Sequence, residues 1–348
     1  MDAQGKSVGD LLGTGHPLGL IGGAARPSLS YTTTLGAQFA GDSLALIPLI
    51  ESESVDLIVT SPPFALLRSK SYGNRDQAEY VDWLTQFGRL ARRVLKETGS
   101  LVMDLGGAYV RGQPVRSLYN YRVLLEFCDS LGYQLAEEFF WHNPSKLPSP
   151  VEWVNKRKIR VKDSVNPVWW LSKSMDPKAD ASRVRVDYSA RMRALLVDPD
   201  KYYRPGIRPS EHRISRSFHR DNGGALPSNL LSLPNTESGS AYLRNCRLLG
   251  QSAHPARFPP DLPRFFIRFL TDPNDVVLDF FSGSNTTGWA AEAEGRRWLA
   301  IEMVQEYATG SAIRFIAGMG DTEKLALWDR MMSGERFHIS DVGAYRLD

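Results

Sequence analysis

Apolar residues along the chain follow two spacings that alternate with each other. Residues 55–59 (VDLIV) form a short, β-branched apolar run, which is typical of a buried strand. Residues 80–99 place apolar side chains three and four positions apart and close with Gly99, so they predict an amphipathic helix. Residues 100–105 return to the strand pattern. A strand, a helix and a second strand are therefore expected in this order.

The same alternation occurs on either side of this unit. Residues 41–52 predict a helix that Asp42 or Ser43 opens as N-cap. Residues 121–133 predict another helix, and residues 134–142 predict a strand that ends in aromatic side chains. Repeated strand and helix in alternation favours a mostly parallel sheet with helices on both faces.

The alternation stops after Pro144 and returns near residue 262. Many Pro, Gly, Ser, Asn and Arg residues fill the chain up to Gly250, which predicts a loop-rich insertion. Residues 262–302 then read as helix, strand, helix and strand. The predicted fold is a doubly wound α/β domain with an insertion. Its expected parts are a flexible N-terminal segment (1–28), two halves of the main domain (29–150 and 251–348) and the insertion (151–250).

Size and composition agree with one large domain that carries a smaller unit. The chain has 348 residues, of which 42% are hydrophobic, and single cores rarely grow beyond about 300 residues. No apolar run approaches the length that spans a bilayer, and the first residues lack the pattern of an export signal. Cys128 and Cys246 stand far apart without metal-ligand spacing. We therefore expect a cytoplasmic protein with no disulfide, no metal and no membrane partner.

Charge is distributed unevenly along the chain. The net charge is only +3, but residues 156–220 contain 17 Lys and Arg against 7 Asp and Glu. A basic segment within an otherwise mildly acidic chain is expected where a protein binds phosphates of a nucleic acid. A solvated charged surface would give the same composition, so charge alone does not decide.

A turn motif at residues 279–288 (DFFSGSNTTG) follows the predicted strand of residues 276–280. Gly283 permits close approach of a ligand to the backbone, and Ser282 offers a hydroxyl at the start of a helix. Glu302 ends the next strand about 20 residues later, where an acid accepts hydrogen bonds from ribose hydroxyls. The turn has one glycine, Gly283, where a pyrophosphate site would need several, so we expect a nucleoside cofactor such as S-adenosylmethionine.

A second motif, TSPPF, ends the strand of residues 55–59. Pro62 and Pro63 lack backbone N–H groups, so this turn presents carbonyl acceptors without competing donors. Ser61 adds a hydroxyl and Phe64 an apolar face, which together suit a planar ring bearing an amino group. Neither cysteine follows a proline, as the nucleophile for carbon methylation of cytosine would be expected to do. The two motifs together favour methyl transfer to an amino nitrogen.

Longer segments that include these motifs carry a family resemblance. The chain resembles the β-class amino-methyltransferases of bacterial restriction-modification systems, and within them the PvuII-type cytosine-N4 enzymes. The resemblance extends from about Gly41 to the helix after Glu302. It rests on TSPPFALLR, EYVDW, DLGGAY, NPSKLPSPVEWVNKRKIRVKD, DNGG, HPARFP and DFFSGSNTTG.

The resemblance implies a role for each motif. Ser61, Pro62, Pro63 and Phe64 would bind and stack on a base flipped out of double-stranded DNA. Phe64 stands where many members have Tyr, so it lacks that hydroxyl. The serine before the prolines implies the N4 of cytosine, because adenine-N6 members carry Asp or Asn there. The predicted insertion would recognise the DNA sequence, and a restriction endonuclease could share it.

The resemblance also implies the cofactor site and a proton acceptor. Asp42 would contact the adenine of S-adenosylmethionine and Glu302 its ribose. Phe280, Ser282 and Gly283 would hold the methionine portion. Asp104, at the end of the strand of residues 100–105, is a candidate for relaying the released proton, and bracing the following turn is its alternative role.

Three other functions stay open at this point. They are an adenine-N6 DNA methyltransferase on the same scaffold, a methyltransferase that acts on RNA or a small molecule, and a catalytically silent DNA-binding protein.

Overall fold

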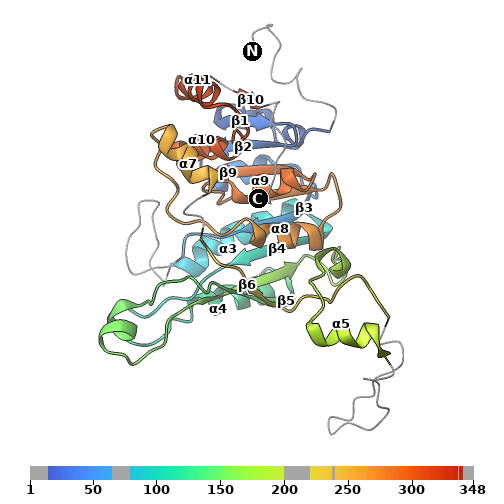
Figure 1. Cartoon of the computed structure of the whole chain (residues 1–348). Coiled ribbons are helices and arrows are strands. Elements are labelled where there is room, and N and C mark those ends of the chain that lie inside the picture. The colour runs from blue at the N-terminus through green and yellow to red at the C-terminus, as the bar shows by residue number, and fades with distance from the viewer. Residues whose placement is uncertain (1–14, 65–78, 200–219, 237–239, 336, 340–348) are drawn as a thin grey trace. The chain divides into compact units, whose positions relative to one another are not determined.

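The computed structural model describes residues 15–64, 79–199, 220–236, 240–335 and 337–339 (Figure 1). Two compact units make up the chain. The larger unit comprises the chain up to Lys178 and from Asn229 onward, and the smaller one is Ala179–Ser228. Residues 1–14, 65–78 and 200–219, which belong to the predicted N-terminal segment, the stretch after TSPPF and the predicted insertion, lie outside the described residues.

A ten-stranded sheet organises the larger unit, in the order β10-β1-β2-β9-β8-β3-β4-β6-β5-β7. Its centre, from β2 to β4, is parallel throughout. Strand β6 lies antiparallel to both β4 and β5, and β1 lies antiparallel to β2. The strands are β1 (Leu29–Thr33), β2 (Gly36–Ala40), β3 (Val55–Thr60), β4 (Leu95–Asp104), β5 (Gln134–His142), β6 (Val165–Ser172), β7 (Leu230–Ser232), β8 (Val276–Asp279), β9 (Arg297–Glu302) and β10 (Phe337–Ile339).

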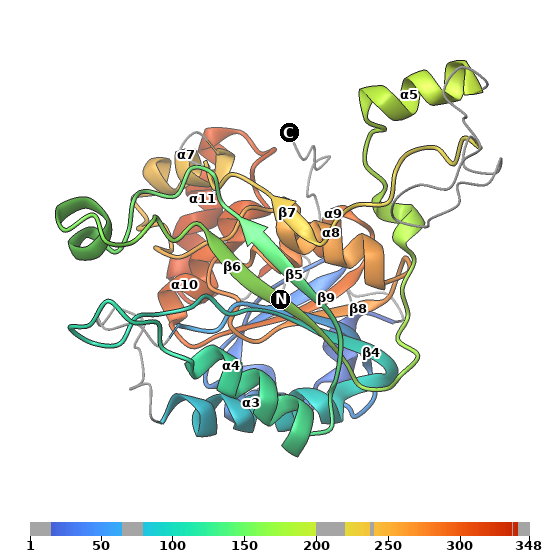
Figure 2. The ribbon, with the colours of Figure 1, turned by 90° about the horizontal axis from the view of Figure 1, so that it is seen from below.

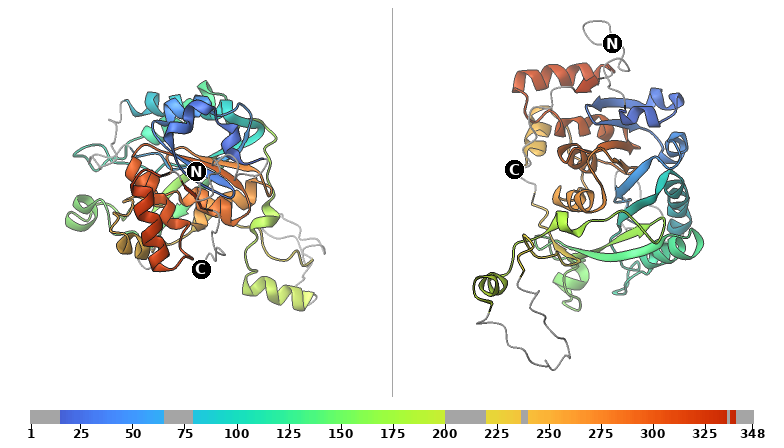
Figure 3. Two further views of the ribbon diagram at one scale, coloured as in Figure 1. Left: turned by 90° about the horizontal axis from the view of Figure 1, so that it is seen from above. Right: turned by 90° about the vertical axis from the view of Figure 1, so that its right-hand side faces the viewer.

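Helices cover both faces of this sheet (Figures 2 and 3). Helices α3 and α4 lie on one face, whereas α8, α9 and α10 lie on the other. This arrangement confirms the predicted doubly wound α/β fold. The helices of the larger unit are α2 (Ser43–Leu46), α3 (Tyr80–Val94), α4 (Tyr119–Leu125), α7 (Ala241–Leu248), α8 (Asp261–Leu270), α9 (Thr286–Ala293), α10 (Gln305–Gly310) and α11 (Asp321–Met332), with short helical turns η1 (Pro17–Leu20), η2 (Gly23–Ser28), η3 (Ile47–Leu49), η4 (Glu126–Ser130), η5 (Glu152–Lys156) and η9 (Ser311–Arg314).

Helix α3 shows how the apolar spacing becomes packing. Its side chains at Tyr80, Leu84, Phe87, Ala91 and Val94 recur every three or four residues, and all are buried. They join the core cluster that lies between the helix and the sheet. The amphipathic pattern thus forms one face of the core, as predicted. The predicted helix end at Gly99 is wrong, because α3 ends at Val94 and Leu95 to Gly99 already belong to β4.

Several elements differ from the sequence-based expectations. The hairpin of β1 and β2 was not expected, and β6 and β7 lie inside the stretch interpreted as loops. Strand β6 contains Pro167, which lies beside Phe140 of β5 and has no N–H to donate, but its carbonyl still accepts from the N–H of Leu105 at 3.3 Å. Residues 15–28 form η1 and η2, and Ile21 and Ala25 are buried in the core.

The smaller unit, Ala179–Ser228, contains η6 (Ala181–Val184) and α5 (Ala190–Val197). Reciprocal backbone hydrogen bonds between Val186 and Ala225 close its chain into a loop. The hydroxyl of Tyr188 donates to the carboxylate of Asp221. This unit lies within the predicted insertion of residues 151–250, whose extent and role stay predictions.

Candidate active site

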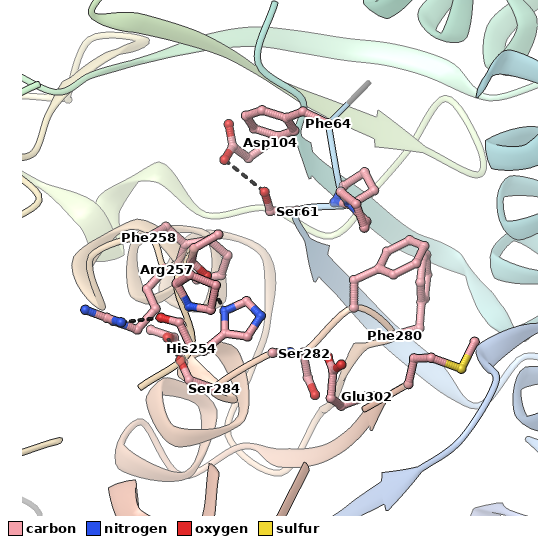
Figure 4. Close-up of a pocket in the computed structure, with 18 of the residues that line it drawn as sticks. Ser61, Phe64, Asp104, His254, Arg257, Phe258, Phe280, Ser282, Ser284 and Glu302 are labelled. Atoms are coloured by element: carbon pink, nitrogen blue, oxygen red, sulfur yellow. Dashed lines mark hydrogen bonds between the residues drawn. The ribbon is translucent and has the colours of Figure 1, made fainter. Parts of the chain in front are cut away.

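Strands β3 and β4 bring Ser61 and Asp104 to one edge of the sheet. The strands run parallel with Thr60 beside Met103, so the residues that follow each strand emerge together. The Ser61 hydroxyl donates to Oδ2 of Asp104 at 3.1 Å (Figure 4). The two residues come from separate motifs and form one hydrogen-bonded pair.

Asp104 is a buried carboxylate with a second donor. Its side chain is 5% exposed, and Nδ2 of Asn166 donates to Oδ1 at 3.0 Å. Burial raises the pKa of Asp104 from 3.8 to about 6, against the opposing effects of the hydrogen bonds from Asn166 and Ser61 and of the charge on Lys146. A carboxyl group with this pKa can bind and release a proton close to neutral pH.

The two prolines and Phe64 form a fixed turn beside this pair. The hydroxyl of Tyr80 in α3 donates to the carbonyl of Pro63 at 2.8 Å. The Phe64 ring lies against Gly106, where an added Cβ would come within 2.5 Å of the ring. The turn and the chain after β4 are therefore packed together without room for a larger side chain at position 106.

The turn that follows β8 lies beside the end of the neighbouring strand β9. Gly283 has φ +51°, and an added Cβ would meet the His254 ring at 2.9 Å, so both conformation and space require glycine. Its N–H donates to Oε2 of Glu302 at 2.8 Å, and the N–H of Val304 donates to Oε1 at 3.0 Å. Burial raises the pKa of Glu302. The carboxylate thus fixes the turn from the neighbouring strand.

Asp42 and Ser43 connect the start of α2 to the same turn. Oδ1 of Asp42 accepts from the N–H of Leu44 at 2.9 Å, which confirms Asp42 as the N-cap. The Ser43 hydroxyl donates to the carbonyl of Phe280 at 2.7 Å. The segment after β2 is therefore held against the segment after β8.

A buried polar layer under the turn supports Ser282 and the strand ends. Nε2 of Gln38 in β2 donates to the hydroxyl of Ser282 at 3.2 Å. The Thr60 hydroxyl donates to Oδ1 of Asp279 at 2.7 Å, joining the ends of β3 and β8. Burial raises the pKa of Asp279 to about 6. Sequence reasoning gave no role to Gln38 or Asp279, because only the sheet order shows that they lie beneath the site.

One cavity of about 680 Å³ unites both sides. All ten predicted site residues line it: Asp42, Ser61, Pro62, Pro63, Phe64, Asp104, Phe280, Ser282, Gly283 and Glu302. The close-up shows the pair of Ser61 and Asp104 on one wall and Glu302 on another (Figure 4). Their individual roles stay predictions, but their common location agrees with one reaction centre.

Other cavity residues were not among the predicted ones. Lys146 and Asn166 line the cavity; Asn166 binds Asp104, and the charge on Lys146 acts on it. His254, Arg257 and Phe258 also line the cavity and lie together near Ser284 (Figure 4). Nδ1 of the His254 ring lies 2.6 Å from the carbonyl of Ala256. Asn166 had no sequence signal, since its position follows from the antiparallel pairing of β6 with β4.

The described residues contain neither a metal cluster nor a membrane-spanning helix. Within residues 15–64, 79–199, 220–236, 240–335 and 337–339, no three His, Cys, Asp or Glu side chains come together in a group that could hold a metal ion. None of the helices in those ranges combines the length and apolar character needed to cross a membrane.

Comparisons with known proteins agree with this geometry. A family model described as DNA methylase, for N6 and N4 methyltransferases, matches residues 55–313. The type II methyltransferase M.PvuII of Proteus hauseri is 53% identical over 90% of this chain and 94% of its own. The DNA adenine methyltransferase YhdJ of Escherichia coli K12 is 25% identical over 87% of this chain and 91% of its own.

Solved structures show the same fold. The PvuII DNA methyltransferase, described as cytosine-N4-specific, superposes with a TM-score of 0.73 and 46% identity over 90% of this chain and 98% of its own. A Thermus thermophilus protein solved with S-adenosyl-L-methionine has a TM-score of 0.50 and 20% identity over 91% of this chain and all of its own. Since the family model and M.PvuII each match well over half of the chain, the chain belongs to the N6/N4 DNA methylase family.

Proposed function

We propose that this protein transfers a methyl group from S-adenosylmethionine to the N4 amino group of cytosine in double-stranded DNA. The observation that carries the proposal is the hydrogen bond from Ser61 to buried Asp104 on the wall of a cavity that Glu302 and Gly283 also line. The high identity to a protein described as cytosine-N4-specific supports the choice of base.

The TSPPF turn supplies the base side of the reaction. The amino nitrogen of cytosine is a poor nucleophile because its lone pair is delocalised into the ring. The Ser61 oxygen and the Pro62 carbonyl accept its hydrogens, which localises the pair, and Phe64 stacks on the ring. The base must leave the duplex to reach this turn, at a cost of a few kcal/mol.

The pair of Ser61 and Asp104 can accept the proton that the amino nitrogen loses. A nitrogen that gains a methyl group must lose one hydrogen as a proton. The Ser61 oxygen can take that proton while its own hydrogen passes to Oδ2 of Asp104, to which it already donates. The serine is then unchanged, the carboxyl group is neutral, and its pKa of about 6 lets it return the proton to solvent at neutral pH.

The opposite wall fits S-adenosylmethionine, whose sulfonium group supplies the methyl. A carboxylate has about four acceptor positions, so Glu302 can accept ribose hydroxyls in addition to the two backbone N–H groups that it binds. Asp42 is an acceptor for an adenine amino group at the start of α2. Phe280, Ser282 and Gly283 would enclose the methionine portion, and the cavity has the size of a small-molecule site.

The same proposal assigns the protein a DNA-binding region, a cellular location and a biological role. The predicted insertion of residues 151–250, with the smaller unit inside it, would contact phosphates and base edges through its Arg and Lys side chains. A protein with this activity works on DNA in the bacterial cytoplasm. The type II methyltransferases among its relatives support a restriction-modification role, in which an endonuclease would share the recognised sequence.

The first test is mass spectrometry of nucleosides from plasmid DNA treated with purified protein and labelled S-adenosylmethionine. Label in N4-methylcytosine is expected, and Ser61→Ala should remove it while leaving cofactor binding intact. Label in N6-methyladenine would assign the adenine alternative, to which the similarity to YhdJ gives some support. Bound cofactor without label in any DNA would favour an RNA or small-molecule acceptor, and absence of cofactor binding would favour a silent DNA-binding protein.

A further inference from the structure

The connection between β5 and β6, residues 143–164, lies at the active edge of the sheet. The two strands are antiparallel, with His142 beside Val165, so this β5–β6 loop begins and ends at one place. Val168 of β6 pairs with Asp104 at the end of β4. The loop therefore emerges beside Asp104, and it projects from the carboxyl edge as the green segment of Figure 1.

Hydrogen bonds brace this loop internally and against its neighbour. Nζ of Lys162 donates to the carbonyls of Pro144 and Lys146 at 3.1 and 3.3 Å. The N–H of Asp163 donates to the carbonyl of Ser149 at 3.1 Å, and its carboxylate pairs with Arg116 at 2.6 Å. These contacts hold the outgoing and returning sides of the loop together on either side of Leu147.

The surface of the loop combines positive charge with exposed apolar side chains. It contains six Lys and Arg against two Asp and Glu. Leu147 is 81% exposed and Val161 is 86% exposed, more than Val151 at 55% and Ile159 at 41%, the other exposed apolar side chains of the loop. Phosphates of DNA would match the charge, and an apolar contact within DNA would match the two side chains.

Leu147 is next in sequence to a residue that lines the cavity. It directly follows Lys146, which lines the cavity and whose charge acts on Asp104. Val161 lies three positions from Ser164, the nearest cavity residue on the returning side of the loop. Leu147 is therefore the exposed apolar side chain that the loop carries next to the base side of the cavity.

Leu147 is placed to assist base flipping. Extruding a cytosine breaks its stacking and leaves a gap in the duplex, and apolar side chains can enter DNA between bases. We propose that Leu147 enters the gap that the flipped cytosine leaves, and so stabilises the extruded state. The inference rests on the proposed function, since it concerns the same reaction on duplex DNA.

The test uses the full chain and short duplexes that carry the methylated site, as mapped by sequencing modified plasmid. One duplex has guanine opposite the target cytosine, and the other has a mismatched base, which lowers the cost of extrusion. Single-turnover rates are measured for the natural protein, Leu147→Ala, Leu147→Met and Val161→Ala. Met175→Ala is the matched control, because Met175 is 77% exposed but follows β6 at the opposite edge of the sheet, where Ser172 pairs with Ser100.

Leu147→Ala should slow transfer on the matched duplex by about tenfold or more, and by less than about threefold on the mismatched one. Leu147→Met and Met175→Ala should stay within about threefold of the natural protein on both duplexes. An unchanged rate for Leu147→Ala, equal losses on both duplexes, or a larger loss for Val161→Ala would overturn the role of Leu147 alone. Failure of the natural protein to modify any cytosine would instead overturn the proposed function, and this inference with it.

Discussion

Replacing Asp104 by Asn should reduce activity and increase stability at the same time. Asn keeps the shape of the side chain but cannot take the proton that leaves the amino nitrogen. Loss of a positioned general base typically slows a reaction by about 10²- to 10⁴-fold. The same change removes a buried negative charge, because burial raises the pKa of Asp104 to about 6.

The size of the stability change follows from that pKa. The pKa of the folded protein lies above the unfolded value of 3.8, so the folded state favours the protonated carboxyl. The contribution of Asp104 to stability is therefore complete below pH 3.8 and is lost as the pH rises through 6. At pH 7.5 the ionised group costs about 3 kcal/mol relative to a neutral one, and at pH 5 about half of that. Loss of one hydrogen bond to Ser61 or Asn166 would offset about 1 kcal/mol.

Urea unfolding of both proteins at pH 7.5 and pH 5 measures this difference. We expect Asp104→Asn to raise the free energy of unfolding by about 2 to 3 kcal/mol at pH 7.5 and by distinctly less at pH 5. Asp176→Asn, at an exposed carboxylate, is the control and should change it by less than about 0.5 kcal/mol at either pH. Equal stability at pH 7.5, or a gain that does not shrink at pH 5, would refute the assignment of a costly buried charge to Asp104.

Three further substitutions test other parts of the site. Gly283→Ala should weaken binding of S-adenosylmethionine by about tenfold or more, measured by calorimetry, because φ +51° strains alanine and its Cβ would meet His254; unchanged affinity would count against this turn as the cofactor site. Asn166→Leu removes a hydrogen bond that lowers the pKa of Asp104, so the acidic limb of the pH–rate profile should move to higher pH, and a profile that stays in place would disconnect Asp104 from the rate. Glu302→Gln loses acceptor positions and should raise KM for S-adenosylmethionine more than it changes kcat, whereas a loss confined to kcat would contradict a binding role.

Local sequence patterns predicted the parts of the site that lie at the ends of regular elements. The TSPPF turn and the turn with Gly283 each follow a short apolar strand, and Asp42 precedes a helical pattern. Parallel strands then bring these ends to one edge of the sheet without further information. The residues of the predicted site could therefore be chosen before their contacts were known.

The remaining parts depend on contacts between distant segments. Asn166 reaches Asp104 only because β6 pairs antiparallel with β4, and a stretch rich in Pro and Asn gives no periodic signal for that strand. Thr60 and Asp279 meet through the pairing of β3 with β8, which leaves no local trace in either segment. Gln38 lies in the hairpin of β1 and β2, for which no strands were predicted from the sequence.

The pairing of β3 with β8 also has a consequence for the order in which the chain can fold during synthesis. Leu57 lies beside Val277, so the centre of the sheet joins segments that leave the ribosome far apart in time. Translation at about 5 to 20 residues per second takes roughly 10 to 50 s to pass from Ser61 to Glu302. Throughout that interval β3 exposes an apolar edge whose partner does not yet exist, and pairings between distant segments close slowly. The nascent chain therefore needs protection from aggregation until its last strands appear, and the cavity can form only at the end of synthesis.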